Sequence, residues 1–319
     1  MAAKPKAPHP SSPPVADASP AEIRPSPEHG LPPWIRIRPP RGPVYPEVRG
    51  ILHDLQLETV CREARCPNLA ECWSAGAATL MLLGTDCTRR CAFCAVTTRW
   101  PRGAVDPTEP ARVAEAVRRW GLRYVVLTQV CRDDLADGGA GLLAETVRRI
   151  HTESPSTLVE LLIGDLGDEE TAIRTVIDAT PDVLAHNLET VRSLSPSVRD
   201  RRAGYDRSLD VLARIRRWAG PEQVTKSSVM LGLGEPDDEL RQAFRDLRTA
   251  GVDLLSLGQY LRPSPGHVAV RRFVPPEEFA TWRRTALELG FAGVEAGPMV
   301  RSSYRAEELY RSARERRGG

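Results

Sequence analysis

The chain has little lysine, few aromatic side chains and no long apolar run. Lysine accounts for only three of its 44 basic residues, and aromatic residues make up 5% of the 319 residues. Without about 18 consecutive apolar residues the chain cannot form a membrane-spanning helix. Its N-terminus lacks the apolar core of a secretory signal, so we expect a cytoplasmic protein. The 42 acidic residues leave a net charge of only +2, which argues against nucleic acid or a membrane surface as a partner.

Proline is concentrated in residues 1–33, which hold ten of the 28 prolines and few large apolar side chains. Such a segment cannot bury enough apolar surface to offset the entropy of ordering it, so we expect a disordered tail. After it we expect an extension rich in proline, arginine and cysteine over 34–76 and a main domain over 77–290. A C-terminal extension over 291–319 is expected to fray from Arg311 onward.

Short apolar runs alternate with segments of helical period along the main domain. Seven runs predict strands: Thr79–Leu83, Tyr124–Thr128, Leu158–Ile163, Asp182–Ala185, Thr225–Leu231, Leu254–Leu257 and Gly293–Val300. Four amphipathic segments predict helices: Pro110–Trp120, Ser208–Trp218, Asp238–Thr249 and Pro276–Leu289. Strands that alternate with helices indicate a parallel sheet and an α/β fold. About six such units favour a partial (β/α)6-type TIM barrel over a doubly wound sheet, with the chemistry at the carboxyl ends of the strands.

Six of the seven cysteines fall within 34 residues, in two groups of three: Cys61, Cys66 and Cys72, then Cys87, Cys91 and Cys94. In a reducing compartment such crowding indicates metal or cluster ligation rather than disulfides. The second group has the spacing CxxxCxxC and follows the first predicted strand of the barrel. Three thiolates on a tight loop can ligate three irons of a cubane and leave the fourth open to a small chelating molecule. A zinc site is the main alternative, but it normally takes four protein ligands.

The CxxxCxxC loop resembles that of the radical S-adenosylmethionine (SAM) superfamily. In that superfamily the amino and carboxylate groups of SAM chelate the open iron, and one electron from the cluster cleaves SAM to a 5′-deoxyadenosyl radical. The first cysteine group, spaced CxxxxCxxxxxC, is a weaker signal by itself, for which zinc binding or simple packing are alternatives.

Together with Arg301-Ser302-Ser303-Tyr304, the two cysteine groups make the chain resemble the lipoyl synthase family. The resemblance runs over roughly 33–310 and includes six further segments: 132–135, 137–140, 186–191, 225–227, 232–235 and 258–264. It implies two 4Fe–4S clusters, one on the CxxxCxxC cysteines with SAM and one auxiliary cluster on the other three. Ser303 is implied as the fourth ligand of the auxiliary cluster, and its hard oxygen matches iron less well than a thiolate does.

The resemblance implies an enzyme, a sulfurtransferase that inserts sulfur at C6 and C8 of a protein-bound octanoyl-lysine. The substrate is then an octanoylated lipoyl carrier protein or lipoyl domain, and the auxiliary cluster is the sulfur donor that is consumed. An unactivated methylene offers no acidic proton and no leaving group, so the reaction needs a radical from a cofactor. An electron donor and an iron–sulfur cluster carrier are the other partners implied.

Further candidates follow predicted strands and rest on weaker signals. Seven residues are expected to contact SAM or line the cavity: Asp137, Gly138, Gly139, Asn187, Glu189, Gly234 and Glu235. Plain turns, and a structural role for neighbouring His186, are the alternatives. Arg301 is expected to support the auxiliary cluster or to gate Ser303, unless it is a helix cap or a surface residue. Lys226, the only lysine beyond residue 6, is expected to face the cavity or an acidic partner.

The chain departs from the usual lipoyl synthase pattern at six matched positions: Arg62, Gln129, Cys131, Gly164, Ala185 and Ser228. None of these is an expected iron ligand, so cluster binding is unaffected. A divergent enzyme with the same two clusters and another substrate therefore stays open, as does a zinc-bound scaffold. Cys131 itself is expected to be a small buried residue.

Overall fold

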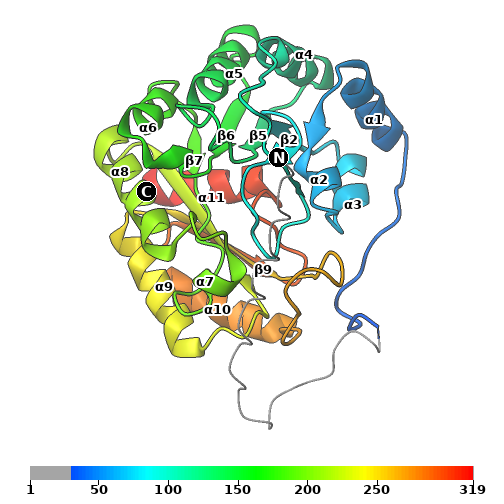
Figure 1. Ribbon diagram of the computed structural model, residues 1–319. Coiled ribbons are helices and arrows are strands. Elements are labelled where there is room, and N and C mark those ends of the chain that lie inside the picture. The colour runs from blue at the N-terminus through cyan, green and yellow to red at the C-terminus, as the bar shows by residue number, and fades with distance from the viewer. Residues whose placement is uncertain (1–29, 319) are drawn as a thin grey trace, which may run out of the picture.

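The computed structural model describes residues 30–318, so most of the expected disordered tail lies outside the described residues. One sheet forms its centre, with the strand order β1-β2-β5-β6-β7-β8-β9-β10 (Figure 1). The bounds are Glu58–Thr59, Thr79–Leu82, Tyr124–Gln129, Leu158–Leu162, Val183–Ala185, Val224–Leu231, Leu254–Gln259 and Gly293–Gly297. Strands β2 to β10 run parallel, whereas β1 pairs antiparallel with β2. All seven predicted strands are confirmed, and a separate pair, β3 (Asp86–Cys87) and β4 (Thr97–Thr98), carries the cysteine loop.

The strands curve into a barrel that stays open, as predicted. Among residues 30–318, β10 pairs only with β9, and no pairing joins it to β1 or β2. The seventh predicted strand, β10 from the C-terminal extension, joins the edge of the barrel, which therefore has one more parallel strand than a (β/α)6-type barrel. The last expected strand ends at Gly297 rather than Val300, since Pro298 has no amide hydrogen to continue the ladder.

Helices cover the outside of the sheet (Figure 1). The four predicted helices are confirmed as α4 (Glu109–Trp120), α8 (Tyr205–Ala219), α9 (Asp237–Thr249) and α10 (Pro276–Glu288). In α4 the predicted inner face is buried at Val113 and Val117, and the helix ends at Gly121, whose φ of 66° suits only a residue without a side chain. The remaining helices were not predicted: α1 (Val44–Asp54), α2 (Val60–Glu63), α3 (Leu69–Ser74), α5 (Ala140–Glu153), α6 (Glu170–Ile177), α7 (Ser195–Val198), α11 (Ala306–Gly318) and the 3-10 turn Leu166–Asp168.

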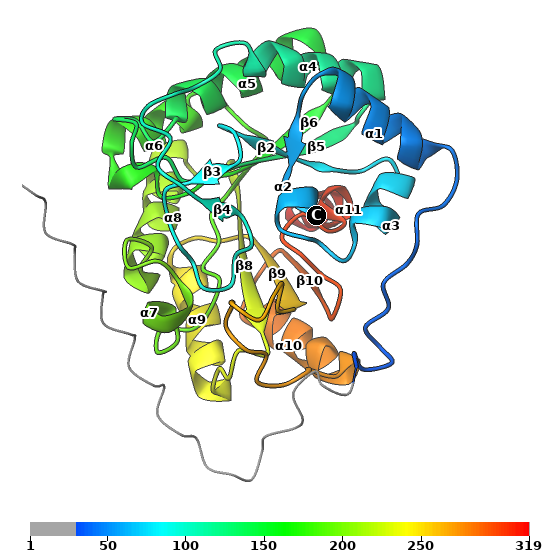
Figure 2. The ribbon, with the colours of Figure 1, turned by 45° about the vertical axis from the view of Figure 1, so that its right-hand side comes forward.

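The expectation that the chain frays from Arg311 is wrong for the described residues, because helix α11 continues to Gly318. Its buried Leu309 and Ala313 pack on the first residues of β7, β8 and β9, which are Val183, Val224 and Leu254. Helix α11 therefore covers the amino ends of these strands. In Figure 2 it is seen end-on, within the ring of strands and helices. No helix within residues 30–318 is long and apolar enough to cross a membrane.

Lys226 of β8 is fully buried and does not line the large cavity described below. Its Nζ lies 2.8 and 2.9 Å from the two carboxylate oxygens of Glu160 in β6, so the acidic group it faces lies within the sheet. The Tyr124 hydroxyl donates to the same carboxylate at 2.7 Å. Burial makes a charge pair of this kind costly to break from one side only.

Replacing Lys226 by methionine is expected to lower the free energy of unfolding by about 3 kcal/mol or more, because the Glu160 carboxylate stays buried without a counter-charge. The double variant Lys226→Met/Glu160→Leu removes both charges and is expected to regain most of that loss. Urea unfolding followed by circular dichroism measures both. A loss below about 1 kcal/mol in the single variant, as for an exposed pair, would contradict the assignment.

Candidate active site

A cavity of about 590 Å³ lies among the carboxyl ends of the parallel strands, and both cysteine groups reach it. Part of its wall is formed by residues that end strands or follow them within three positions: Gln129, Leu162, Asn187, Gln259 and Val300. Five of the six expected cysteine ligands line it: Cys61, Cys66, Cys87, Cys91 and Cys94. The sixth, Cys72, lies outside this wall. A volume of this size fits a cofactor and part of a substrate chain.

The CxxxCxxC loop turns tightly along the cavity wall. The Cys94 amide donates to the Cys91 carbonyl at 3.1 Å, and the Asp200 amide donates to Sγ of Cys91 at 3.4 Å. Burial raises the pKa of Cys94 to about 12, whereas a hydrogen bond from the Cys131 thiol is the main cause that lowers the pKa of Cys87 to about 6. Amide N–H groups that point at sulfur favour the thiolate, the form that binds metal.

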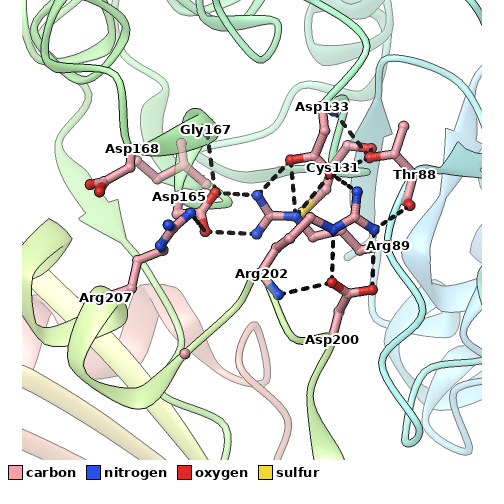
Figure 3. A network of polar contacts seen from close by, with 12 residues as sticks. Thr88, Arg89, Cys131, Asp133, Asp165, Gly167, Asp168, Asp200, Arg202 and Arg207 are labelled. Atoms are coloured by element: carbon pink, nitrogen blue, oxygen red, sulfur yellow. Dashed lines mark hydrogen bonds and ion pairs between the residues drawn. The ribbon is translucent and has the colours of Figure 1, made fainter. Parts of the chain in front are cut away.

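Arg89, between the first two cysteines of this loop, is the centre of a buried charge network (Figure 3). The residue is 4% exposed, and its guanidinium lies between two carboxylates. Nε and Nη2 donate to Asp133 at 2.6 to 3.1 Å, and Nη1 and Nη2 donate to Asp165 at 2.7 and 2.6 Å. Asp133 follows β5 and Asp165 follows β6, so one guanidinium ties the cysteine loop to the ends of two strands.

A second arginine holds the backbone of the same loop (Figure 3). Nη2 of Arg202 donates to the Thr88 carbonyl at 2.7 Å, and its Nη1 donates to Asp133 at 3.0 Å. The carboxylate of Asp200 accepts the Arg90 amide at 2.9 Å. The segment between α7 and α8 thus fixes the loop from the other side.

The first cysteine group is built on the short helices α2 and α3. Cys61 lies in α2 and Cys72 in α3, and the Cys66 amide donates to the Cys61 carbonyl at 3.0 Å between them. Burial, with the neighbouring thiols of Cys61 and Cys66, raises the pKa of Cys72 to about 12. Within the described residues no three His, Cys, Asp or Glu side chains converge on a point where one metal ion could bind. Ligands of a cubane bind separate irons and lie further apart than ligands of one ion.

The C-terminal Arg-Ser-Ser-Tyr segment lies against this first group. The Thr79 hydroxyl donates to Oγ of Ser303 at 2.7 Å, and the backbone of Thr79 is also hydrogen-bonded to the thiol of Cys61. The Asn68 amide group donates to the Met299 carbonyl at 2.6 Å, and the Tyr304 hydroxyl donates to Glu71 at 3.2 Å. The two extensions, more than 220 residues apart in sequence, therefore meet at one wall of the cavity.

Arg301 is partly buried and lines the cavity, so it is neither a helix cap nor a fully exposed surface residue. Its Nη1 donates to the Val300 carbonyl at 2.6 Å, whereas Nη2 is buried and has no partner in the described part of the chain. Burial lowers the pKa of Arg301, and the thiol of Cys66 acts on it in the opposite direction. An unpaired guanidinium N–H beside thiols fits an anionic iron–sulfur group in the cavity. The Val300 carbonyl lies directly against Gly258. A side chain at position 258 would collide with it, so the packing of this segment requires glycine there.

Asn187 and Glu189 line the cavity as expected. The Ser302 hydroxyl donates to Oδ1 of Asn187 at 3.3 Å, and burial raises the pKa of Glu189. His186 has both ring nitrogens hydrogen-bonded, to the Ile163 carbonyl and to Ser208, each at 2.9 Å. Burial lowers its pKa to about 4, so it is neutral at physiological pH, and the structural alternative holds for it.

The five other expected SAM contacts do not line the cavity; they are Asp137, Gly138, Gly139, Gly234 and Glu235. They build turns instead. The Asp137 carboxylate accepts the Gly139 and Gly141 amides, both at 2.9 Å, at the start of α5. The Glu235 carboxylate accepts the Gly232 and Leu233 amides at 2.7 and 2.9 Å. Gly138 has a φ of 59° and packs on the backbone of Leu166. Both the conformation and the contact favour a residue without a side chain.

Three departures from the family pattern form one patch of the cavity wall. A Cβ on Gly164 would lie 3.1 Å from Sγ of Cys131 and 3.2 Å from Nε2 of Gln129, so the glycine leaves room for both. All three line the cavity, and Cys131 is thus a wall residue rather than only a compact core residue. Sequence reasoning missed both this contact and the Arg89 network. The available signals for the network were Arg89 inside the cysteine loop and the acidic residues Asp133 and Asp165 after two strands.

Two family models match the chain. The model described as the radical SAM superfamily matches residues 81–247, and the N-terminal domain of lipoyl synthase of the radical SAM family matches residues 21–66. A lipoyl synthase from Thermus thermophilus is 53% identical over 93% of this chain and 92% of its own length. One from Halorhodospira halophila is 55% identical over 87% of this chain and 83% of its own.

The structure of Streptococcus suis SuiB bound to S-adenosylmethionine aligns with a TM-score of 0.50 at 10% identity, over 70% of this chain and 50% of that one, which supports the fold alone. The identities to the curated relatives extend over most of both chains. The chain therefore belongs to the lipoyl synthase family of radical SAM enzymes.

Proposed function

We propose that this enzyme inserts sulfur at C6 and C8 of an octanoyl chain carried on a lysine of a lipoyl carrier protein or lipoyl domain. Cys87, Cys91 and Cys94 hold one 4Fe–4S cluster with SAM, and Cys61, Cys66, Cys72 and Ser303 hold an auxiliary one. When bound, SAM and its cluster supply a 5′-deoxyadenosyl radical, and the auxiliary cluster supplies sulfur. The observation that carries this proposal is that both cysteine groups border one cavity, with Ser303 beside the Cys61 group. The enzyme is located in the cytoplasm in this proposal, and it works with an electron donor and an iron–sulfur cluster carrier.

The chain's own residues position and shield the reacting groups in this proposal. Arg89 and Arg202 hold the cysteine loop rigid, so that its three thiols keep a fixed position relative to the opposite wall. Arg301 directs its unpaired Nη2 toward the charge that the auxiliary site would hold. Apolar residues such as Met81, Val229 and Phe273 line the space between and exclude water, which protects a reactive radical from side reactions.

Metal content tests the two-cluster assignment. After anaerobic reconstitution we expect about eight irons per chain, falling to about four in Cys61→Ala and to about four in Cys87→Ala. Cys131→Ala is the matched control and should keep about eight, since this thiol is not an assigned ligand. Iron, sulfide and zinc analysis of the three variants measures this. Zinc without iron, or the loss of all iron in either ligand variant, would contradict it.

Ser303→Ala is expected to separate the two halves of the chemistry. With an octanoyl-lysyl peptide, SAM and a reductant, the variant should still form 5′-deoxyadenosine but at least about tenfold less thiolated peptide, because the Cys87 site is untouched. Ser302→Ala is the neighbouring control. If the unaltered enzyme forms 5′-deoxyadenosine and no thiolated peptide, the substrate is another acyl chain and the departures at Gln129, Cys131 and Gly164 become its cause.

Arg89→Lys is expected to loosen the cysteine loop, because one ammonium cannot replace the fork that binds Asp133 and Asp165 together. The free energy of unfolding should fall by about 2 kcal/mol or more. Electron paramagnetic resonance of the reduced Cys61→Ala background, which isolates the Cys87 cluster, should show a changed signal. Arg90→Lys is the control, since that side chain is exposed. Equal behaviour of the two variants would refute the positioning role.

A further inference from the structure

Three segments border the open side of the cavity, and we call them the rim: residues 30–46, 60–67 and 260–276. Each contributes residues to the cavity lining, among them Leu31, Arg65 and Arg262. Leu31 and Ile37 line the cavity and are still 46% and 57% exposed, so the first segment lies where the cavity meets solvent. In Figure 2 this segment, drawn in blue, runs along the outer edge of the molecule up to α1.

The rim is strongly basic although the chain is nearly neutral. Its three segments hold one acidic residue, Glu63, and eight arginines: Arg36, Arg38, Arg41, Arg62, Arg65, Arg262, Arg271 and Arg272. Since the net charge of the whole chain is +2, the remainder of the chain is net negative. Positive charge is thus concentrated in three segments that contribute to the cavity lining, and Arg65 and Arg262 belong to the lining itself.

Most of these arginines form no ion pair within the described residues, although Arg36 and Arg262 donate to nearby backbone carbonyls. Arg38 pairs with Glu71 at 3.6 Å, and Arg272 donates to Glu278 at 2.7 Å. The other six form no ion pair with a carboxylate among residues 30–318: Arg36, Arg41, Arg62, Arg65, Arg262 and Arg271. On the outer helices, Arg149 and Arg174 each pair with a glutamate one turn away, whereas the exposed Arg148, Arg217 and Arg245 form no ion pair among residues 30–318.

We propose that the rim docks an acidic protein surface, namely the face of the carrier domain that presents the octanoyl-lysine. This inference rests on the proposed function and adds how the carrier is recognised. Unpaired arginines would meet carboxylates around the modified lysine, and the exposed Leu31 and Ile37 would contact the acyl chain as it enters. Charge complementarity of this kind speeds association and selects the partner, and it weakens as salt screens it.

The test uses the full-length reconstituted enzyme and an octanoylated lipoyl domain of net negative charge. The variant Arg36→Glu/Arg41→Glu/Arg271→Glu reverses three rim charges that lie outside the cavity lining. The matched control, Arg148→Glu/Arg217→Glu/Arg245→Glu, makes the same change in charge on the exposed faces of α5, α8 and α9. We expect the Kd for the domain to rise at least about tenfold in the rim variant and within about twofold in the control.

Salt and a small substrate complete the test. At about 0.5 M salt the difference between rim variant and unaltered enzyme should shrink to about threefold or less, because the charges are screened. A neutral octanoyl-lysyl peptide should be thiolated by the unaltered enzyme and the rim variant alike. If the peptide reacts but the rim variant binds the domain as the control does, the docking surface is wrong. If the unaltered enzyme does not thiolate the peptide, the proposed function fails instead.

Discussion

The guanidinium of Arg89 is the interaction on which the candidate active site depends. It is buried between the carboxylates of Asp133 and Asp165, and it belongs to the loop that carries three cysteines. A loop of this kind has no strand or helix of its own to hold it, apart from the two-residue strands at its ends. The buried ion pairs replace that missing framework, and they do so at the ends of β5 and β6, two neighbouring strands inside the sheet.

Much of the fold could be predicted because its signals are local. The structure can be predicted from the residues of the segment alone in apolar runs such as Leu158–Leu162 and in amphipathic segments such as Asp237–Thr249. Helix α11 was missed because its mean composition is polar and its apolar contact with the barrel rests on few residues, chiefly Leu309, Tyr310 and Ala313. Helix α5 begins at Ala140 after Gly139, whose φ is 91°, and its first amides are capped by the carboxylate of Asp137, a signal that the sequence reading assigned to SAM instead.

The candidate site likewise has a part that could be predicted from local sequence and a part that could not. The spacing of the six cysteines is local and pointed to a cluster chemistry that the family comparison supports. The contacts that position them are not local: Arg89 reaches Asp165 across 76 positions, and Thr79 reaches Ser303 across 224. The SAM contacts expected after strands stay a prediction. Asp137 and Glu235 follow strands, as SAM contacts would, but their carboxylates satisfy nearby backbone amides.

The contact between the two extensions also sets an order of events during synthesis. The barrel strands and the Cys87 loop precede the Arg-Ser-Ser-Tyr segment along the chain, and a chain that folds as it emerges can complete the former first. The pocket beside Cys61 gains its last wall only when residues near the very end, Met299 and Ser303, have left the ribosome and closed a loop of more than 220 residues. A nascent chain can therefore fold the loop of the Cys87 group before the wall beside Cys61 is complete.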